Sequence, residues 1–189
     1  MKHLSMLALC SVIVACVAAC TAAEGEIEEP RTKLESFAAQ HGSSIVKRFS
    51  EVGSLMGNYD TSLSVDIIEL TNARTGDQSH GVTVEVTEGG RYEKSDKSYI
   101  DYDEIQSLVD GLTYIATVDP VDAHFDDFEA RYKTLGDFEV TLFSSGQSVK
   151  LAVSSGRIGK ATAFFSESSL LKLKNLLSQA KTKLDAARP

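Results

Sequence analysis

Alternating apolar and polar residues predict eight β-strands in two groups of four. Between positions 63 and 67, for example, leucine, valine and isoleucine alternate with serine and aspartate. A period of two places one face of a strand on a core and the other in solvent, which is typical of antiparallel sheets. Short turns with glycine favour hairpins. We expect strands near 44–53, 61–72, 80–88 and 91–100, and again near 126–134, 137–144, 148–154 and 158–165.

Each group of strands is followed by a segment with a helical period. One helix is predicted over 102–117 and another over 167–186, because apolar residues recur there at intervals of three and four. These residues are Ile105, Leu108, Val109, Leu112 and Ile115 in the first segment, and Leu170, Leu173, Leu177, Ala180 and Leu184 in the second. Asp101 and Glu104 have the spacing of a capping box, so we expect them to cap the first helix.

The pattern therefore indicates the α+β class, with antiparallel sheets built from two ββββα halves and two amphipathic helices packed on them. A single domain is expected over 32–189, with halves at 32–118 and 124–189. The shared order is consistent with an internal pseudo-twofold repeat. Doubled ββββα units resemble the whirly family, relatives of a coactivator that binds single-stranded DNA, and the saddle of TATA-binding protein. The likeness is one of topology, so it implies a fold and no function.

The N-terminus has the form of a secretory signal. After Met1-Lys2-His3 the chain runs without charge from Leu4 to Ala19, which is shorter than the roughly 20 residues of a membrane-spanning helix. Val17-Ala18-Ala19-Cys20 resembles the lipobox of bacterial lipoprotein precursors. That resemblance implies a signal peptide at 1–19 and a lipid-modified Cys20, carrying a diacylglyceryl group and usually an acyl chain such as palmitate. Thr21 in place of aspartate implies the outer membrane. The alternative is ordinary cleavage after Ala23.

The net charge of the chain limits the kinds of binding partner that can be expected. The chain has 189 residues, with 19 Lys and Arg against 27 Asp and Glu, a net charge of −8. This balance argues against binding to nucleic acid and against peripheral binding to an anionic lipid surface. Four of the acids lie between residues 24 and 30, so the segment 20–31 is interpreted as an acidic tether. All three cysteines lie within the first twenty residues, so no disulfide framework is expected.

The search for catalytic or ligand-binding motifs leaves few candidates, and no cofactor is predicted. The basic turn 156–161 resembles a phosphate loop incompletely, which makes Arg157 and Lys160 candidate anion contacts. Asp122, Asp126 and Asp127 are candidate ligands for calcium, in a stretch without EF-hand spacing. Phe143 and Phe164 fall out of phase with the apolar stripe of their strands. These two aromatic residues are the candidates for an exposed face.

The sequence therefore favours a non-catalytic lipoprotein of the bacterial envelope that binds another envelope component. One alternative is a module that binds a small molecule or a metal ion. Another is a hydrolase with scattered Asp, Glu and His, including His80 and His124. An enzyme is the less favoured reading, because no catalytic motif is complete. An exposed sheet edge could also pair two copies into a homodimer.

Overall fold

The computed structural model describes residues 29–118, 125–146 and 148–187. The predicted signal peptide at 1–19, Cys20 with most of the tether, Asp122 and His124 lie outside these residues. In the described part of the chain, no helix combines the length and the apolar character needed to cross a membrane.

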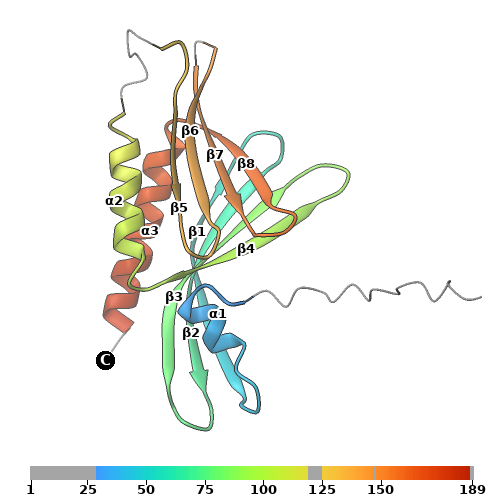
Figure 1. The fold of residues 1–189 in the computed structure, drawn as a ribbon, viewed down its shortest axis with the longest axis vertical. Coiled ribbons are helices and arrows are strands. Elements are labelled where there is room, and N and C mark those ends of the chain that lie inside the picture. The colour runs from blue at the N-terminus through green and yellow to red at the C-terminus, as the bar shows by residue number, and fades with distance from the viewer. Residues whose placement is uncertain (1–28, 119–124, 147, 188–189) are drawn as a thin grey trace, which may run out of the picture.

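The chain folds as the predicted α+β arrangement, in two halves with the same order of four strands and a helix (Figure 1). The first half begins with an additional short helix. The first half comprises α1 (Lys33–Ala38), β1 (Ile45–Met56), β2 (Ser62–Asn72), β3 (Gln78–Glu88), β4 (Lys94–Asp101) and α2 (Ile105–Ile115). The second comprises β5 (Glu129–Lys133), β6 (Glu139–Ser145), β7 (Ser148–Ser155), β8 (Ala161–Ser166) and α3 (Ser169–Ala187).

Each group of strands forms its own antiparallel sheet in sequence order, β1-β2-β3-β4 and β5-β6-β7-β8. This confirms the antiparallel prediction, and the reason is the period of two. Val82, Val84 and Val86 are completely buried on one face of β3, while the residues between them face the other side.

Each of the two long helices packs against the sheet of the other half, so the halves exchange helices. α3, which follows the second sheet, packs against β1 and β2 of the first, and α2 packs against β5 of the second. The two helices also pack against each other and lie side by side along one side of the molecule (Figure 1). Gly111 permits the close approach of α2 to β5, because a Cβ there would lie 2.2 Å from the ring of Tyr132. One apolar core consequently contains residues of both sheets and both long helices.

A second, smaller core lies on the opposite face of the first sheet. There α1 places Leu34 against Ile68 and Leu70 of β2, with Phe37 and Tyr99 packed around them. The sequence pattern did not predict this helix, because six residues are too few to show a helical period. Its N-terminus is held by a capping box between Thr32 and Glu35.

The predicted capping box of Asp101 and Glu104 is wrong. Asp101 accepts hydrogen bonds from the backbone N–H groups of Lys33 and Leu34, at 2.7 and 2.9 Å, so it caps α1 instead of α2. Glu104 begins α2 without a side-chain cap and accepts a hydrogen bond from the backbone of Leu135. The end of β4 lies beside the free N–H groups at the start of α1, and these groups donate to the Asp101 carboxylate.

Candidate functional site

The outer face of the second sheet carries the features of an interaction surface. Its inner face is mainly apolar, with Val140, Leu142, Leu151 and Val153 buried in the core. Residues directly opposite one another in an antiparallel sheet share a face. The strand register therefore places three rows on the outer face: Lys133, Glu139, Ser154 and Thr162; Arg131, Thr141, Ala152 and Phe164; and Glu129, Phe143, Lys150 and Ser166.

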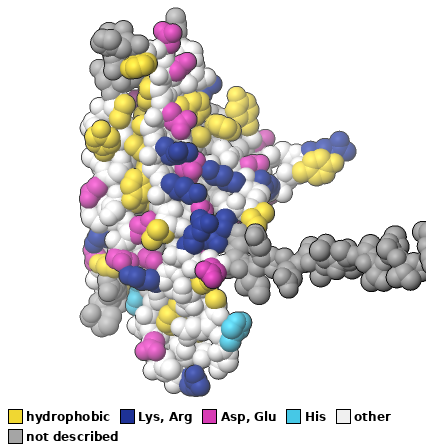
Figure 2. Space-filling view, viewed as in Figure 1, with side chains coloured by type: hydrophobic (Ala, Val, Ile, Leu, Met, Phe, Trp, Pro, Cys, Tyr) yellow, Lys and Arg dark blue, Asp and Glu magenta, His cyan; other side chains and the backbone are white. Residues whose placement is uncertain are grey.

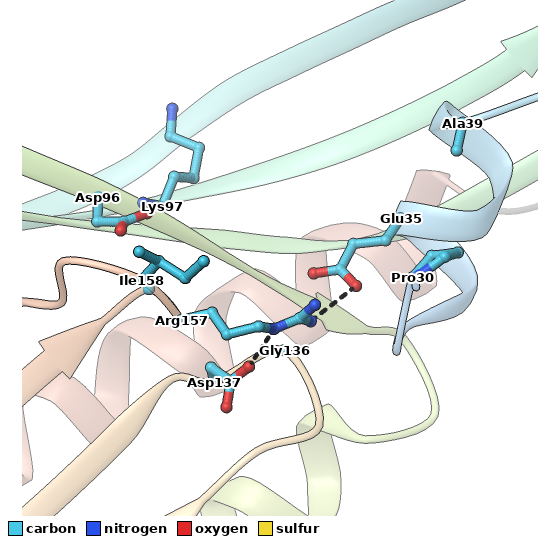
Figure 3. Close-up of a pocket in the computed structure, with 10 residues that line it drawn as sticks. Pro30, Glu35, Ala39, Asp96, Lys97, Gly136, Asp137, Arg157 and Ile158 are labelled. Carbon is cyan, nitrogen blue, oxygen red and sulfur yellow. Dashed lines mark hydrogen bonds and ion pairs between the residues drawn. The ribbon is translucent and has the colours of Figure 1, made fainter. Parts of the chain in front are cut away.

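Below this face a cleft of about 370 Å³ opens where the two sheets and α1 meet (Figure 3). The β5–β6 turn, the β7–β8 turn, β4 and α1 all contribute to it. In Figure 3 the side chain of Arg157 extends between Asp137 and Glu35. Gly136 allows the β5–β6 turn to reach β4, since a Cβ there would lie 2.0 Å from the carbonyl oxygen of Tyr99.

Asp137 is the charged centre of this junction. Its carboxylate is 4% exposed and lies 3.0 Å from a guanidinium nitrogen of Arg31, 2.7 Å from Lys133 Nζ and 2.9 Å from Arg157 Nε. Burial alone would raise the pKa of Asp137. The hydrogen bonds from Lys133 and Arg157, together with the positive charges of Lys133 and Arg31, outweigh that effect and hold the pKa below its usual value. Asp137 also adopts a φ of 61°, which aspartate tolerates in tight turns.

The charges around the cleft and the outer face are layered. The Asp137 and Glu139 carboxylates lie underneath, at 4 and 14% exposure, while their partners Arg31, Lys133 and Lys160 reach 52, 50 and 38%. Arg157, at 20%, is buried about as far as Glu35, at 23%, and Glu129 at the edge of the outer face is exposed. Figure 2 shows Lys and Arg side chains gathered over the second sheet. We call this surface the basic face and define it by Arg31, Arg131, Lys133, Lys150, Arg157 and Lys160.

Aromatic and apolar groups border the basic face. Phe164 is exposed, as its position out of phase predicted, and Phe143 is half-buried in the same face. Ile158 at the tip of the β7–β8 turn is 76% exposed. Isolated exposed apolar groups are ordinary, but aromatic residues and arginine are both enriched in protein interfaces.

The two predicted anion contacts lie on this face and are paired with carboxylates of the chain. Arg157 bonds to Asp137, and Lys160 Nζ lies 2.9 Å from Glu139 Oε1. A free anion would have to compete with these fixed carboxylates. The incomplete phosphate-loop motif correctly predicted a basic turn between two strands. No pattern in the sequence indicated Asp137, Lys133 or Arg31 as members of the site. Asp137 is 106 positions from Arg31, so their contact has no local signal.

The described residues do not form a cluster of calcium ligands. Within residues 29–118, 125–146 and 148–187, no three His, Cys, Asp or Glu side chains come together as a metal site. Asp127 accepts a hydrogen bond from Ser144 Oγ at 2.8 Å, and Asp126 is exposed. Asp122 lies outside the described residues.

Two titratable groups outside the basic face have a buried side-chain atom with no hydrogen-bond partner among the described residues. His80 Nε2 is buried, 3.4 Å from Glu69 Oε2, and makes no hydrogen bond to any described residue. Glu104 is half-buried, and its Oε1 accepts a hydrogen bond from the backbone N–H of Leu135 in the β5–β6 turn. Burial raises its pKa, with the charges of Asp101 and Asp103 acting in the same direction. Its Oε2 has no hydrogen-bond partner among the described residues.

Comparison of the sequence with protein-family models and with curated proteins gives no match.

Proposed function

We propose that this chain is a lipid-anchored, non-catalytic binding module of the bacterial cell envelope, and that its basic face holds an acidic surface of another envelope protein. The observation that carries the proposal is the layering of exposed cations over buried carboxylates. A chain of net charge −8 has here concentrated positive charge on one face, against its overall balance.

The buried carboxylates support this role by holding the cations in place. A free lysine or arginine loses rotamer entropy when it binds, and a side chain already held by a carboxylate loses less. Lysine and arginine each have several donors, so a cation bonded to Asp137 or Glu139 can still contact a second carboxylate. Exposed Phe164 and Ile158 add apolar contact area of the kind that protein partners bury.

The position of the tether supports an envelope location. Arg31 belongs to the basic face and is the end of the predicted tether. A chain from Cys20 to Arg31 spans at most about 40 Å. With Cys20 in a membrane, the basic face would therefore stay within reach of proteins at that membrane, while the acidic tether would keep the domain off an anionic lipid surface.

The test is affinity isolation of the native protein from crosslinked cells, with two double variants compared. Arg131→Glu with Lys150→Glu reverses charge on the basic face, whereas Lys172→Glu with Lys183→Glu makes the same change at exposed positions on α3. We expect the first variant to lose a stoichiometric protein partner and the second to keep it. Equal recovery from both variants, or recovery of the protein alone, would refute the proposal.

Cys20→Ser in the same experiment tests the anchor. We expect the variant to leave the membrane fraction and to lose the partner, because the two proteins would no longer share a surface. Retention in the membrane fraction would contradict lipidation at Cys20.

A second candidate function, binding of a small anion, is favoured by the cleft at the junction, which Arg157 lines. Calorimetry with inorganic phosphate separates the two candidates. Binding that is abolished by Arg157→Gln would support the small-molecule module.

A further inference from the structure

The first sheet ends in an uncovered strand edge. β1 is the outermost strand of that sheet, and in the part of the chain that the structure describes only β2 is hydrogen-bonded to it. Residues 46–51 of β1 are all exposed, although the end of α3, at Leu184 and Ala187, borders Arg48 and Ser50 on one face. Phe49, in the middle of this segment, is 69% exposed. An edge of this kind presents unpaired backbone groups and an apolar anchor, and is a template for pairing with another strand.

The β-bulge in β1 does not protect this segment. The bulge falls between Glu51 and Gly53, and from Ile45 to Glu51 the strand pairs with β2 in regular register. Natural edges are often blunted by lysine, and Lys47 would repel most incoming strands. Its effect depends on which residue of the second strand lies opposite.

We propose that two copies of this chain pair through their β1 strands, antiparallel and centred on Phe49. A two-fold axis perpendicular to the sheet then places Phe49 opposite Phe49 of the second copy. Lys47 lies opposite Glu51, and the symmetry makes this ion pair twice. These residues share one face of the strand, as shown by Lys47 Nζ lying 5.7 Å from the centre of the Phe49 ring. Arg48 falls opposite Ser50 on the other face.

Charge selects this register among its neighbours. With the axis at Lys47, Arg48 or Glu51, the central residue faces its own copy, so two like charges meet. An axis at Ser50 places Glu51 opposite Phe49 and forms no ion pair. The register centred on Phe49 therefore satisfies both charges and stacks the exposed aromatic rings. The product is one continuous sheet of eight strands across two copies, an isologous interface.

This inference is independent of the proposed function, because it uses the first sheet and none of the residues of the basic face. It is tested by sedimentation of the purified full chain over a wide range of concentration. We expect a monomer–dimer equilibrium whose dissociation constant rises about tenfold in Lys47→Glu and in Glu51→Lys, since each change creates two like-charge pairs. The double variant Lys47→Glu with Glu51→Lys restores opposite charges and should return to the wild-type constant. Lys172→Glu on α3 is the matched control.

Cysteine crosslinking tests the register separately. Phe49→Cys should form a disulfide-linked dimer on mild oxidation, because the two positions face each other, and Ser50→Cys should form much less. A wild-type protein that is monomeric at every concentration would overturn the proposal. So would a dimer that the two charge reversals leave unchanged, or one that crosslinks better through position 50. Circular dichroism of each variant shows whether a loss of dimer reflects unfolding.

Discussion

The two halves of the chain have the same order of elements and bury the same kind of inner face, but their outer faces differ. In the second sheet, the outer face carries exposed cations over buried carboxylates, and no helix of the described chain covers it. In the first sheet, α1 covers one end of the outer face, and the rest mixes both signs, with Lys97 bonded to Glu85 at 2.8 Å and Glu51 beside Asp66. The apolar inner faces are needed for the fold, whereas the residues of the outer faces can differ without loss of the core. The difference between the two outer faces is therefore where we place the proposed function.

The largest expected effect on stability comes from truncating a side chain in the core that both halves share. Leu173 on α3 is completely buried in the common core. Leu173→Ala should lower the free energy of unfolding by about 3 kcal/mol, from lost burial and the cavity left behind. Because α3 packs on the first sheet, both sheets should lose hydrogen-exchange protection together in one urea transition. Leu171→Ala, at an exposed position of α3, serves as the control; separate transitions for the two halves would contradict a shared core.

A smaller and local effect is expected from Leu34→Ala. Leu34 is the buried anchor of α1 and contacts Ile68 and Leu70 on the outer face of the first sheet alone. We expect a loss of about 2 kcal/mol, limited to α1 and the adjoining ends of β2 and β3. Hydrogen exchange read by mass spectrometry should show faster exchange there, with amides of the second sheet unchanged as an internal reference. Equal loss in both sheets would mean that α1 supports more than its own half.

The corresponding test in the second half is Asp137→Asn. Asparagine keeps the turn conformation but removes the charge that three cations surround. At neutral pH we expect a loss of about 1.5 kcal/mol, a modest value because the cations are partly exposed. The lowered pKa of Asp137 means that its contribution is complete above about pH 4 and is lost as the pH falls through the folded-state pKa. Urea titrations at several pH values should therefore show the variant and the wild type converging in acid; a constant difference would argue that the charge is irrelevant.

Glu104→Gln should have the smallest effect and the opposite sign. Glu104 lies where the two halves meet, between α2 and the β5–β6 turn, and no cation of the described residues compensates for its burial. Its raised pKa means that the native state pays for ionisation at neutral pH, and that this cost disappears below about pH 4. The amide should keep the bond from Leu135 and gain about 0.5 kcal/mol at neutral pH. A clear loss of stability at pH 7 would show that the charged form is favoured after all.

The strands and long helices could be predicted because burial is periodic along them. Their boundaries agree with the structure to within a few residues, as for the strand expected near 61–72 and found at Ser62–Asn72. α1 could not be found in this way, because it is held by its capping residues Thr32, Glu35 and Asp101 and by a single buried leucine, and has no repeated apolar pattern. The capping prediction failed for the same reason: Asp101 caps residues 67 and 68 positions earlier in the chain.

The candidate site could likewise be predicted only in part from the sequence. The basic turn with Arg157 and Lys160 was visible as a local motif, and the exposure of Phe164 followed from its phase in the strand. The carboxylates that hold the two cations were not visible. Asp137 and Glu139 are an ordinary turn residue and an ordinary strand residue until the register of β5 to β8 brings them beneath the cations.

The exchange of helices also sets an order of events during synthesis. The first sheet is complete when residue 101 has left the ribosome, yet the helix that covers β1 and β2 ends at Ala187. Contacts that join the two ends of a chain form late and slow its folding. Before α3 has been synthesised, the apolar face of the first sheet lacks the helix that covers β1 and β2. We therefore expect the chain to reach its stable fold only when almost all of it has been synthesised.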